Sequence, residues 1–287
     1  MAAARFRGCF CLYVGLILMC SCSGGRMATV TEGTGSIRQD LASGHVQKAL
    51  DTCHTEYQKA PKASDVSEQY VATIEHVKGM GDRAFQKEDF ALAGETYGIL
   101  FKNFSRFDSF ANLSFDRNYL TSRIRVSRIR LAERQAQSYL STGSLQKAIN
   151  VYGDLLQHYP RDPTVQAQCT ALLESIETRA ELAFEKDDLA LAGSAYRVLQ
   201  KNFGTNLFRA CSLSFSRDHV DGRIAACRRK LFDDGLEQYR SGNLPRAIAA
   251  WKSILTFDPE DPEVKKATET ATLQMKNLEK EKTRGGR

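Results

Sequence analysis

The sequence predicts an all-α protein, an α-solenoid of about five helical hairpins with a C-terminal capping helix. Three observations lead to this prediction: one segment recurs 99 residues later, a second segment occurs three times at the same spacing, and each copy carries an alanine and an aromatic residue at helical spacing. With 42% apolar residues and 6 prolines in 287 residues, the chain has enough material to bury a core, which argues against extensive disorder.

The first two observations amount to an internal duplication. The stretch 89–100, DFALAGETYGIL, recurs at 188–199 as DLALAGSAYRVL, a spacing of 188 − 89 = 99 residues. Glycine-led segments at 44–50, 143–149 and 242–248 repeat with the same spacing, since 143 − 44 and 242 − 143 are both 99. Chance does not plausibly produce this regularity, so the chain holds a duplication of about 99 residues and an additional partial copy.

The two kinds of segment also resemble each other, and together they mark five equivalent positions whose spacing alternates between 44 and 55 residues. Each has a turn, an apolar residue, two variable residues, an alanine, and an aromatic or cysteine four residues later. Residues at i and i+4 share one helix face, so the alanine lets a neighbouring helix approach while the ring fills the gap beside it. We expect these residues to pack the helices together: Ala49, Ala93, Tyr97, Ala148, Tyr152, Ala192, Tyr196, Ala247 and Trp251.

This pattern resembles the second helix of the tetratricopeptide repeat (TPR), and the resemblance covers most of residues 36–260. In the third copy it is carried by Ala136, Tyr139, Ala148, Tyr152 and Pro160. The family's unit has about 34 residues, so the copies here carry extra length, which falls in the first helices and in the segments 103–116 and 202–216. The resemblance implies a scaffold that binds partner proteins in a groove.

The two long segments share a Leu-Ser-Phe motif, at 113–115 and at 213–215. A long loop inside a compact array is often functional. Because the motif is repeated, a structural role in bracing adjacent hairpins is the favoured interpretation, and a functional loop is the alternative.

The predicted first helices carry clustered arginines. In the resembling family the first helices line the concave groove, so the resemblance implies that these cations face a partner. Arginines in such a groove would suit carboxylates or phosphates through bidentate contacts, whereas the alternative is an ordinary solvated helix face. The candidate groove cations are Arg123, Arg130, Arg134, Arg223 and Arg229.

The N-terminal segment has the signature of a secretory signal. Arg5 and Arg7 precede an apolar run at 9–20 that is shorter than the about 20 residues of a membrane-spanning helix. Its exit, LMCSC at 18–22, resembles the lipobox of bacterial lipoproteins. The resemblance implies that residues 1–21 are removed and that Cys22 carries the lipid.

The same resemblance implies a place in the cell envelope. Ser23 follows the cysteine, which in that family favours the outer membrane, with the chain facing the periplasm. Residues 22–35 are expected to form a flexible tether between the membrane and the helical domain. Plain secretion and a retained anchor are the alternatives.

Patterns for common catalytic or metal chemistry do not occur in the sequence. HExxH, GxxxxGK[ST] and GxSxG are absent, and the five histidines are scattered without an i, i+4 pair. We therefore expect no catalytic residue, no metal and no cofactor. The carboxylates at 88–89 and 187–188 fall at predicted turns, where they would satisfy free backbone N–H groups of the next helix. A net charge of +6 is mild and is not gathered in a recognisable module, so nucleic acid is not an expected partner.

The body of the chain holds too few cysteines for a disulfide-stapled fold: Cys53, Cys169, Cys211 and Cys227. Cys211 and Cys227 would meet if the second long loop folds back onto its helix, so a bridge between them and buried free thiols are both open. A last helix is expected from Asp261-Pro262. The helical domain is thus predicted over 36–281, with a disordered basic tail at 282–287.

These observations favour an interaction scaffold over an enzyme. The leading hypothesis is a lipid-anchored adaptor that holds an envelope protein or peptide partner at a membrane, as in outer-membrane, secretion or pilus assembly. The alternatives are a structural protein associated with peptidoglycan or polysaccharide, and an enzyme whose site is assembled across helices and is invisible in the sequence.

Overall fold

The structure, a computed structural model, describes residues 31–110 and 112–285. It is 81% helical, with no strand in these ranges, which confirms the predicted all-α class. The chain divides into two compact units, residues 1–73 and 74–287, and the boundary falls within helix α3, Ser64–Gln86.

The first unit contains α1 (Thr31–Ala42), α2 (Val46–Lys59) and the beginning of α3. Helices α1 and α2 pack against each other. On α2, His54 Nδ1 lies 3.0 Å from the hydroxyl of Tyr70 in α3, and the ring of Tyr57 stacks on Tyr70 at 5.3 Å between centroids. The aromatic contacts therefore join α2 to the start of α3.

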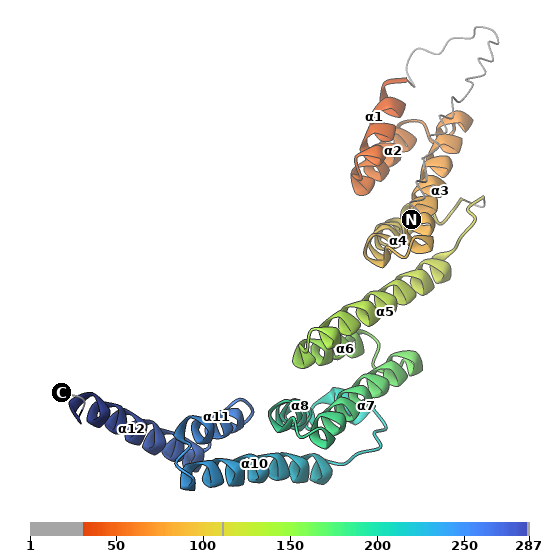
Figure 1. The fold of residues 1–287 in the computed structure, drawn as a ribbon. Coiled ribbons are helices and arrows are strands. Elements are labelled where there is room, and N and C mark those ends of the chain that lie inside the picture. The colour runs from red at the N-terminus through yellow and green to blue at the C-terminus, as the bar shows by residue number, and fades with distance from the viewer. Residues whose placement is uncertain (1–30, 111, 286–287) are drawn as a thin grey trace, which may run out of the picture. The chain divides into compact units, whose positions relative to one another are not determined.

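The second unit is a series of helices, most of which contact the next helix along the chain (Figure 1). The short helix at 206–210 instead contacts the helix at 145–158, and the helices on either side of it in the chain contact each other directly. After the end of α3 its elements are α4 (Phe90–Asn103), the 3-10 helix η1 (Phe104–Arg106), α5 (Arg117–Ser141), α6 (Leu145–His158), α7 (Pro163–Glu185), α8 (Leu189–Asn202), α9 (Asn206–Ala210), α10 (Arg217–Arg240), α11 (Leu244–Leu255) and α12 (Pro262–Gly285). Figure 1 shows α5 with α6, α7 with α8, and α10 with α11 running back and forth as hairpins.

The turns inside the hairpins share one backbone conformation. The residue at the turn has a positive φ of 59–79°, and it is glycine at 44, 143 and 242 but Glu88 and Asp187 at the other two positions. These five positions follow the 44 and 55 spacing of the repeat. Asp89 and Asp188 then cap the next helices by accepting from the backbone N–H groups of Leu92 and Leu191, at 3.1 and 3.3 Å. The predicted capping role is confirmed for Asp89 and Asp188. It is wrong for Glu88 and Asp187, which take the positive φ of the turn and pair with Arg134 and Lys230.

The repeated alanines and rings lie in the core. Ala49, Ala93, Ala148, Ala192 and Ala247 have no exposed surface, and the rings of Tyr97, Tyr152, Tyr196 and Trp251 are at most 4% exposed. Sixteen residues before each ring stands a small residue of the preceding helix: Gly81, Ala136, Ala180 and Gly235. A Cβ on Gly81 would lie 2.8 Å from the Tyr97 ring, and one on Gly235 would lie 2.2 Å from Trp251 Nε1. The two helices of these hairpins therefore approach in direct contact.

The two Leu-Ser-Phe segments make the same contact in both copies. The backbone N–H and the hydroxyl of Ser114 both donate to the carboxylate of Glu75 on α3, at 2.5 and 2.6 Å. Ser214 donates to Glu174 on α7 in the same way, at 2.6 Å for both bonds. The motif thus fastens each long segment to the first helix of the preceding hairpin, which is the bracing role.

Two predicted boundaries differ from the structure. Helix α1 begins at Thr31, so residues 31–35 are helical although the sequence placed them in the tether. Helix α12 continues to Gly285, so the tail predicted from 282 is helical through 285. A helix started by packed residues propagates at little cost, which extends both ends beyond the last apolar positions. Among the described helices, none has the length and apolar character needed to cross a bilayer.

Candidate functional site

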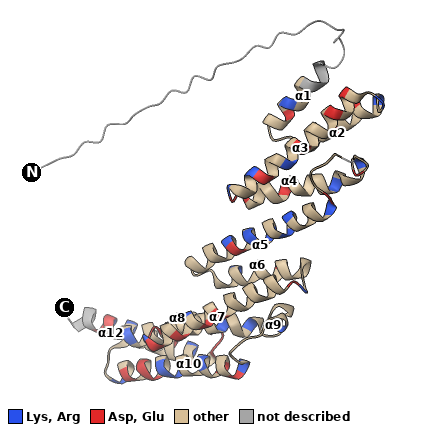
Figure 2. Ribbon diagram, turned by 90° about the vertical axis from the view of Figure 1, so that its right-hand side faces the viewer, with Lys and Arg blue, Asp and Glu red and all other residues tan. Residues whose placement is uncertain are grey.

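Three of the five predicted groove arginines lie on α5, where several cationic positions follow one another (Figure 2). Arg123 stacks over the ring of Phe85, 4.8 Å from its centroid, and over Tyr119 at 5.2 Å. Its equivalent on α10, Arg223, stacks over Phe184 at 4.6 Å. Both cations are therefore engaged within the protein, and each packs the first helix of its hairpin against the end of the first helix of the preceding hairpin.

Arg130 and Arg134 line a groove of about 720 Å³ in the second unit. Its walls are the end of α3, the first residue of α4 and the middle of α5. The lining residues are Phe85, Gln86, Glu88, Phe90, Val126, Arg130, Glu133, Arg134 and Gln137. Rings and a valine thus supply apolar surface, and charged side chains surround it.

The charges around this groove are paired with each other. Arg134 donates to the backbone carbonyl of Glu88 at 2.7 Å, forms an ion pair with the Glu88 carboxylate, and stacks over Phe90 at 4.9 Å. Arg130 lies 2.9 Å from the Glu133 carboxylate. The side chains of Arg130 and Arg134 stay 55% and 52% exposed, so a partner can still reach them.

Arg229, the remaining candidate, is exposed on α10 and forms no ion pair with a described residue. The structure therefore brings only Arg130 and Arg134 to a common groove. The predicted lipid site, Cys22, lies outside the described residues.

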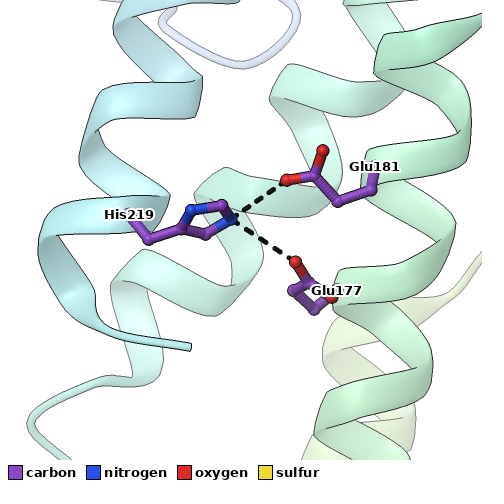
Figure 3. Close-up of side chains that lie close together, drawn as sticks. All are labelled: Glu177, Glu181 and His219. Atoms are coloured by element: carbon purple, nitrogen blue, oxygen red, sulfur yellow. Dashed lines mark hydrogen bonds and ion pairs between the residues drawn. The ribbon is translucent and has the colours of Figure 1, made fainter. Parts of the chain in front are cut away.

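A second site joins α7 to α10 (Figure 3). Glu177 and Glu181 are four residues apart on α7 and share one face of the helix. His219 stands in the first turn of α10, where the Ser216 hydroxyl caps the helix by accepting from the His219 backbone N–H at 3.1 Å. His219 Nε2 points to both carboxylates, 3.0 Å from Glu181 Oε1 and 3.4 Å from Glu177 Oε1.

The surroundings of this cluster shift the pKa values of its two carboxyl groups in opposite directions. Burial raises the pKa of Glu177, and the negative charge of Glu181 raises it further. Burial also disfavours ionisation of Glu181, but hydrogen bonding with Tyr196 and the Arg223 guanidinium outweigh it and lower the pKa of Glu181. Arg223 holds both Glu181 oxygens, with Nε 2.8 Å from Oε1 and Nη2 2.7 Å from Oε2.

The Tyr196 hydroxyl lies beside the Glu181 carboxylate. Tyr196 has no exposed surface, and its hydroxyl has no partner of good hydrogen-bond geometry among the described residues. Its ring faces that of His219 edge-on, with 6.4 Å between centroids. Burial raises the pKa of Tyr196, and the adjacent Glu181 carboxylate adds to the shift, so the phenol stays protonated and can donate.

Sequence reasoning missed this cluster because its histidine and its glutamates come from different helices. The five histidines are scattered along the sequence, and no local pattern marks one of them as a ligand. A signal was nevertheless present, since aligning the two copies of the duplication places Glu177 opposite Lys78 and His219 opposite Tyr119, while Glu181 stands opposite another acidic residue, Asp82. In the described part of the chain, Glu177, Glu181 and His219 form a group of potential metal ligands, with one ligand atom from each lying within 4.8 Å of the other two.

A pair of thiols also comes together in the second unit. Cys211 Sγ lies 2.8 Å from Cys169 Sγ on α7, and both are free thiols. Hydrogen bonding between the two sulfurs raises the pKa of Cys169, which burial raises further, and lowers the pKa of Cys211. Cys227 is a separate buried thiol, and burial raises its pKa to about 11. The partner of Cys211 is therefore Cys169 and not Cys227.

Comparison with known proteins assigns no family to the chain. No family model matches it, and no curated protein matches it significantly.

Proposed function

We propose that this protein is an envelope adaptor that recognises a segment of a partner protein in the groove between the α3–α4 turn and α5. The observation that carries the proposal is that two arginines selected from the sequence, Arg130 and Arg134, line one groove with Phe85, Phe90 and Val126. A concave surface that combines apolar side chains with a few polar groups is the usual form of a recognition site.

The repeat supports the same proposal. Hairpins that follow one another at 44 and 55 residues, with buried alanines and rings at equivalent positions, fit a TPR-like solenoid of about five hairpins closed by α12. In such an array each hairpin contacts its neighbours, and the faces that remain uncovered bind partners.

The groove favours a peptide segment over a small charged ligand. Its two arginines are already balanced by Glu88 and Glu133, so the groove has no net charge to attract a lone anion. A segment with an aromatic or aliphatic side chain would cover the exposed ring surface. A carboxylate of the partner, next to that side chain, would then replace Glu88 or Glu133 as the ion-pair partner of an arginine. Because one ion pair is exchanged for another, this contact adds to the specificity of binding more than to its affinity.

A photo-crosslinking amino acid at Gln137 tests the groove in the native cell. Gln137 lines the groove and is exposed, whereas Gln135 is exposed on the same helix outside it and serves as the matched control. The expected result is a discrete product from position 137 alone. Equal products from both positions, or none from either, would contradict the proposal.

The captured protein then allows a quantitative test. Its affinity for the purified chain is expected to fall about tenfold or more for Val126→Asp, because a buried contact at the centre of an interface carries much of the binding energy. Gln135→Asp introduces the same charge outside the groove and is expected to leave the affinity unchanged.

The anchor forms a separate part of the proposal, supported by the N-terminal sequence. We expect Cys22→Ala to release the protein from membranes and Cys20→Ala to leave it bound, because lipidation would occur at Cys22 alone. Fractionation of cells that express each variant measures this. Unchanged membrane association of Cys22→Ala would exclude the lipid anchor.

A further inference from the structure

The two copies of the duplication carry different charges at one equivalent place. The corresponding pairs are Lys78 and Glu177, Asp82 and Glu181, Tyr97 and Tyr196, Arg123 and Arg223, and Tyr119 and His219. The first three pairs are 99 residues apart, and the last two are 100 apart, as are the Leu-Ser-Phe motifs that precede them. The comparison therefore shows what the second copy has changed within a common framework.

In the first copy the acidic group has a cation of its own. Lys78 Nζ lies 3.0 Å from Asp82 Oδ2 and 5.3 Å from the centroid of the Tyr119 ring. The hydroxyls of Tyr97 and Tyr119 both donate to Asp82 Oδ1, at 2.5 and 2.6 Å. Every polar group of this cluster has a partner, and the Asp82 carboxylate binds the lysine ammonium and both hydroxyls.

In the second copy a carboxylate replaces the ammonium. In the first copy one lysine, one aspartate and one arginine give a formal charge of +1, whereas in the second two glutamates and one arginine give −1. Tyr196 retains its place, but its hydroxyl has no partner of good hydrogen-bond geometry within residues 31–110 and 112–285. The second copy thus keeps the framework of the first and lacks the cation.

We propose that Glu177, Glu181 and His219 bind a divalent transition-metal ion, which supplies the charge that Lys78 supplies in the first copy. The separations of His219 Nε2 from the two carboxylate oxygens, 3.0 and 3.4 Å, suit this role. Metal–ligand bonds of about 2.0–2.2 Å place neighbouring ligand atoms about 3.0–3.5 Å apart. Two carboxylates and one imidazole are a ligand set for Zn²⁺, Fe²⁺ or Mn²⁺.

The groups around the three ligands match the second layer of a metal site. Arg223 binds both oxygens of Glu181 and so fixes the direction of that carboxylate. Hydrogen bonds to ligands from outside commonly orient them in this way. The buried Tyr196 hydroxyl lies beside the Glu181 carboxylate, where it can donate to a ligand oxygen or to a water on the ion. Three protein ligands leave at least one coordination position for water.

The ion would join α7, the first helix of one hairpin, to α10, the first helix of the next. Glu177 and Glu181 come from α7, and His219 comes from the first turn of α10, immediately after the braced Leu-Ser-Phe segment. Metal binding would therefore stabilise the second copy, as any ligand that binds only the folded state does.

Titration of the full chain with Mn²⁺, followed by the electron paramagnetic resonance signal of the free ion, tests the proposal. Mn²⁺ is the probe because the thiols of the chain compete for softer ions such as Zn²⁺. Glu177→Lys restores the lysine of the first copy, so it is expected to stay folded and to weaken Mn²⁺ binding about tenfold or more. Glu185→Lys makes the same charge change at an exposed position of α7 and is the matched control.

The expected result is one Mn²⁺ per chain for the unchanged protein and for Glu185→Lys, with weakened binding by Glu177→Lys and by His219→Tyr, which also restores a first-copy residue. Far-UV circular dichroism checks that both variants are folded. Absence of binding by the unchanged protein, or equal weakening by the Glu185 control, overturns the proposal. The cluster would then be an ion pair in which a protonated His219 is itself the cation.

Discussion

Gly235 lies where the first helix of the last hairpin touches the second, and replacing it with alanine tests the packing of the repeat. A Cβ built on Gly235 would lie 2.2 Å from Trp251 Nε1 and 2.5 Å from Cδ1. Ordinary contacts of this kind are 3.4 Å or more, so the ring or the helix must move by about 1 Å. Trp251 is 2% exposed and has no room to move away from α10.

The magnitude follows from three terms. Overpacking in a well-filled core costs about 1–3 kcal/mol, and a clash this severe belongs at the upper end. A displaced ring also loses the hydrogen bond from Trp251 Nε1 to the Phe232 carbonyl, 3.3 Å long, which contributes about 1 kcal/mol. Alanine is favoured over glycine inside a helix by about 1 kcal/mol. Together these terms predict that Gly235→Ala lowers the free energy of unfolding by about 3 kcal/mol.

Gly222→Ala is the matched control, because Gly222 lies in the same helix and no atom stands within 4 Å of its added Cβ. Only the helix preference applies there, so the control should gain about 1 kcal/mol. Trp251 is the only tryptophan of the chain, so its fluorescence during urea unfolding reports on this hairpin. Gly235→Ala as stable as Gly222→Ala would refute the close packing of α10 on α11.

Two further predictions concern the ion pairs and the thiols. The Arg125 guanidinium and backbone N–H groups at the start of α7 lower the pKa of Asp162 below 3.8 despite its burial. The ionised Asp162 therefore stabilises the folded state at neutral pH, and this contribution is lost as the pH falls through the lowered pKa. Asp162→Asn keeps a capping side chain, so we expect it to lower the free energy of unfolding by about 1 kcal/mol at pH 7 and to leave it unchanged in strong acid. Urea unfolding measures both values, and an equal loss at the two pH values would contradict this prediction. Oxidation of the folded chain by an added disulfide reagent should bridge Cys169 and Cys211 with loss of both thiol hydrogens, detected by peptide mass mapping, with Cys211→Ser as control; a bridge from Cys211 to Cys227 instead would contradict the observed pairing.

The sequence predicted the helical class and the repeat because both depend on local patterns. Ala93 and Tyr97 are buried as their i, i+4 spacing requires, and Asp89 caps its helix as its place at a turn requires. The ends were less predictable. Residues 31–35 and 282–285 are helical without an apolar pattern of their own, because a helix propagates from the packed turns beside them.

The groove was predicted only in part. Arg130 and Arg134 line it, but Arg123 and Arg223 are occupied by Phe85, Glu181 and other internal partners. Arginines on one helix look alike in the sequence, and their separation depends on which neighbour each one meets. No local pattern contains that information.

By itself, the sequence determined the spacing of the hairpins, the positions of their turns and the residues that form their core. Helical periodicity and turn-forming residues are patterns among residues close in the chain, and the duplication makes each pattern appear twice. Only the tertiary structure decided that Glu177 and Glu181 meet His219, that Cys211 meets Cys169 and that Ser214 meets Glu174. Each of these contacts joins residues about 40 positions apart, and the path and packing of the intervening helices set which side chains come together.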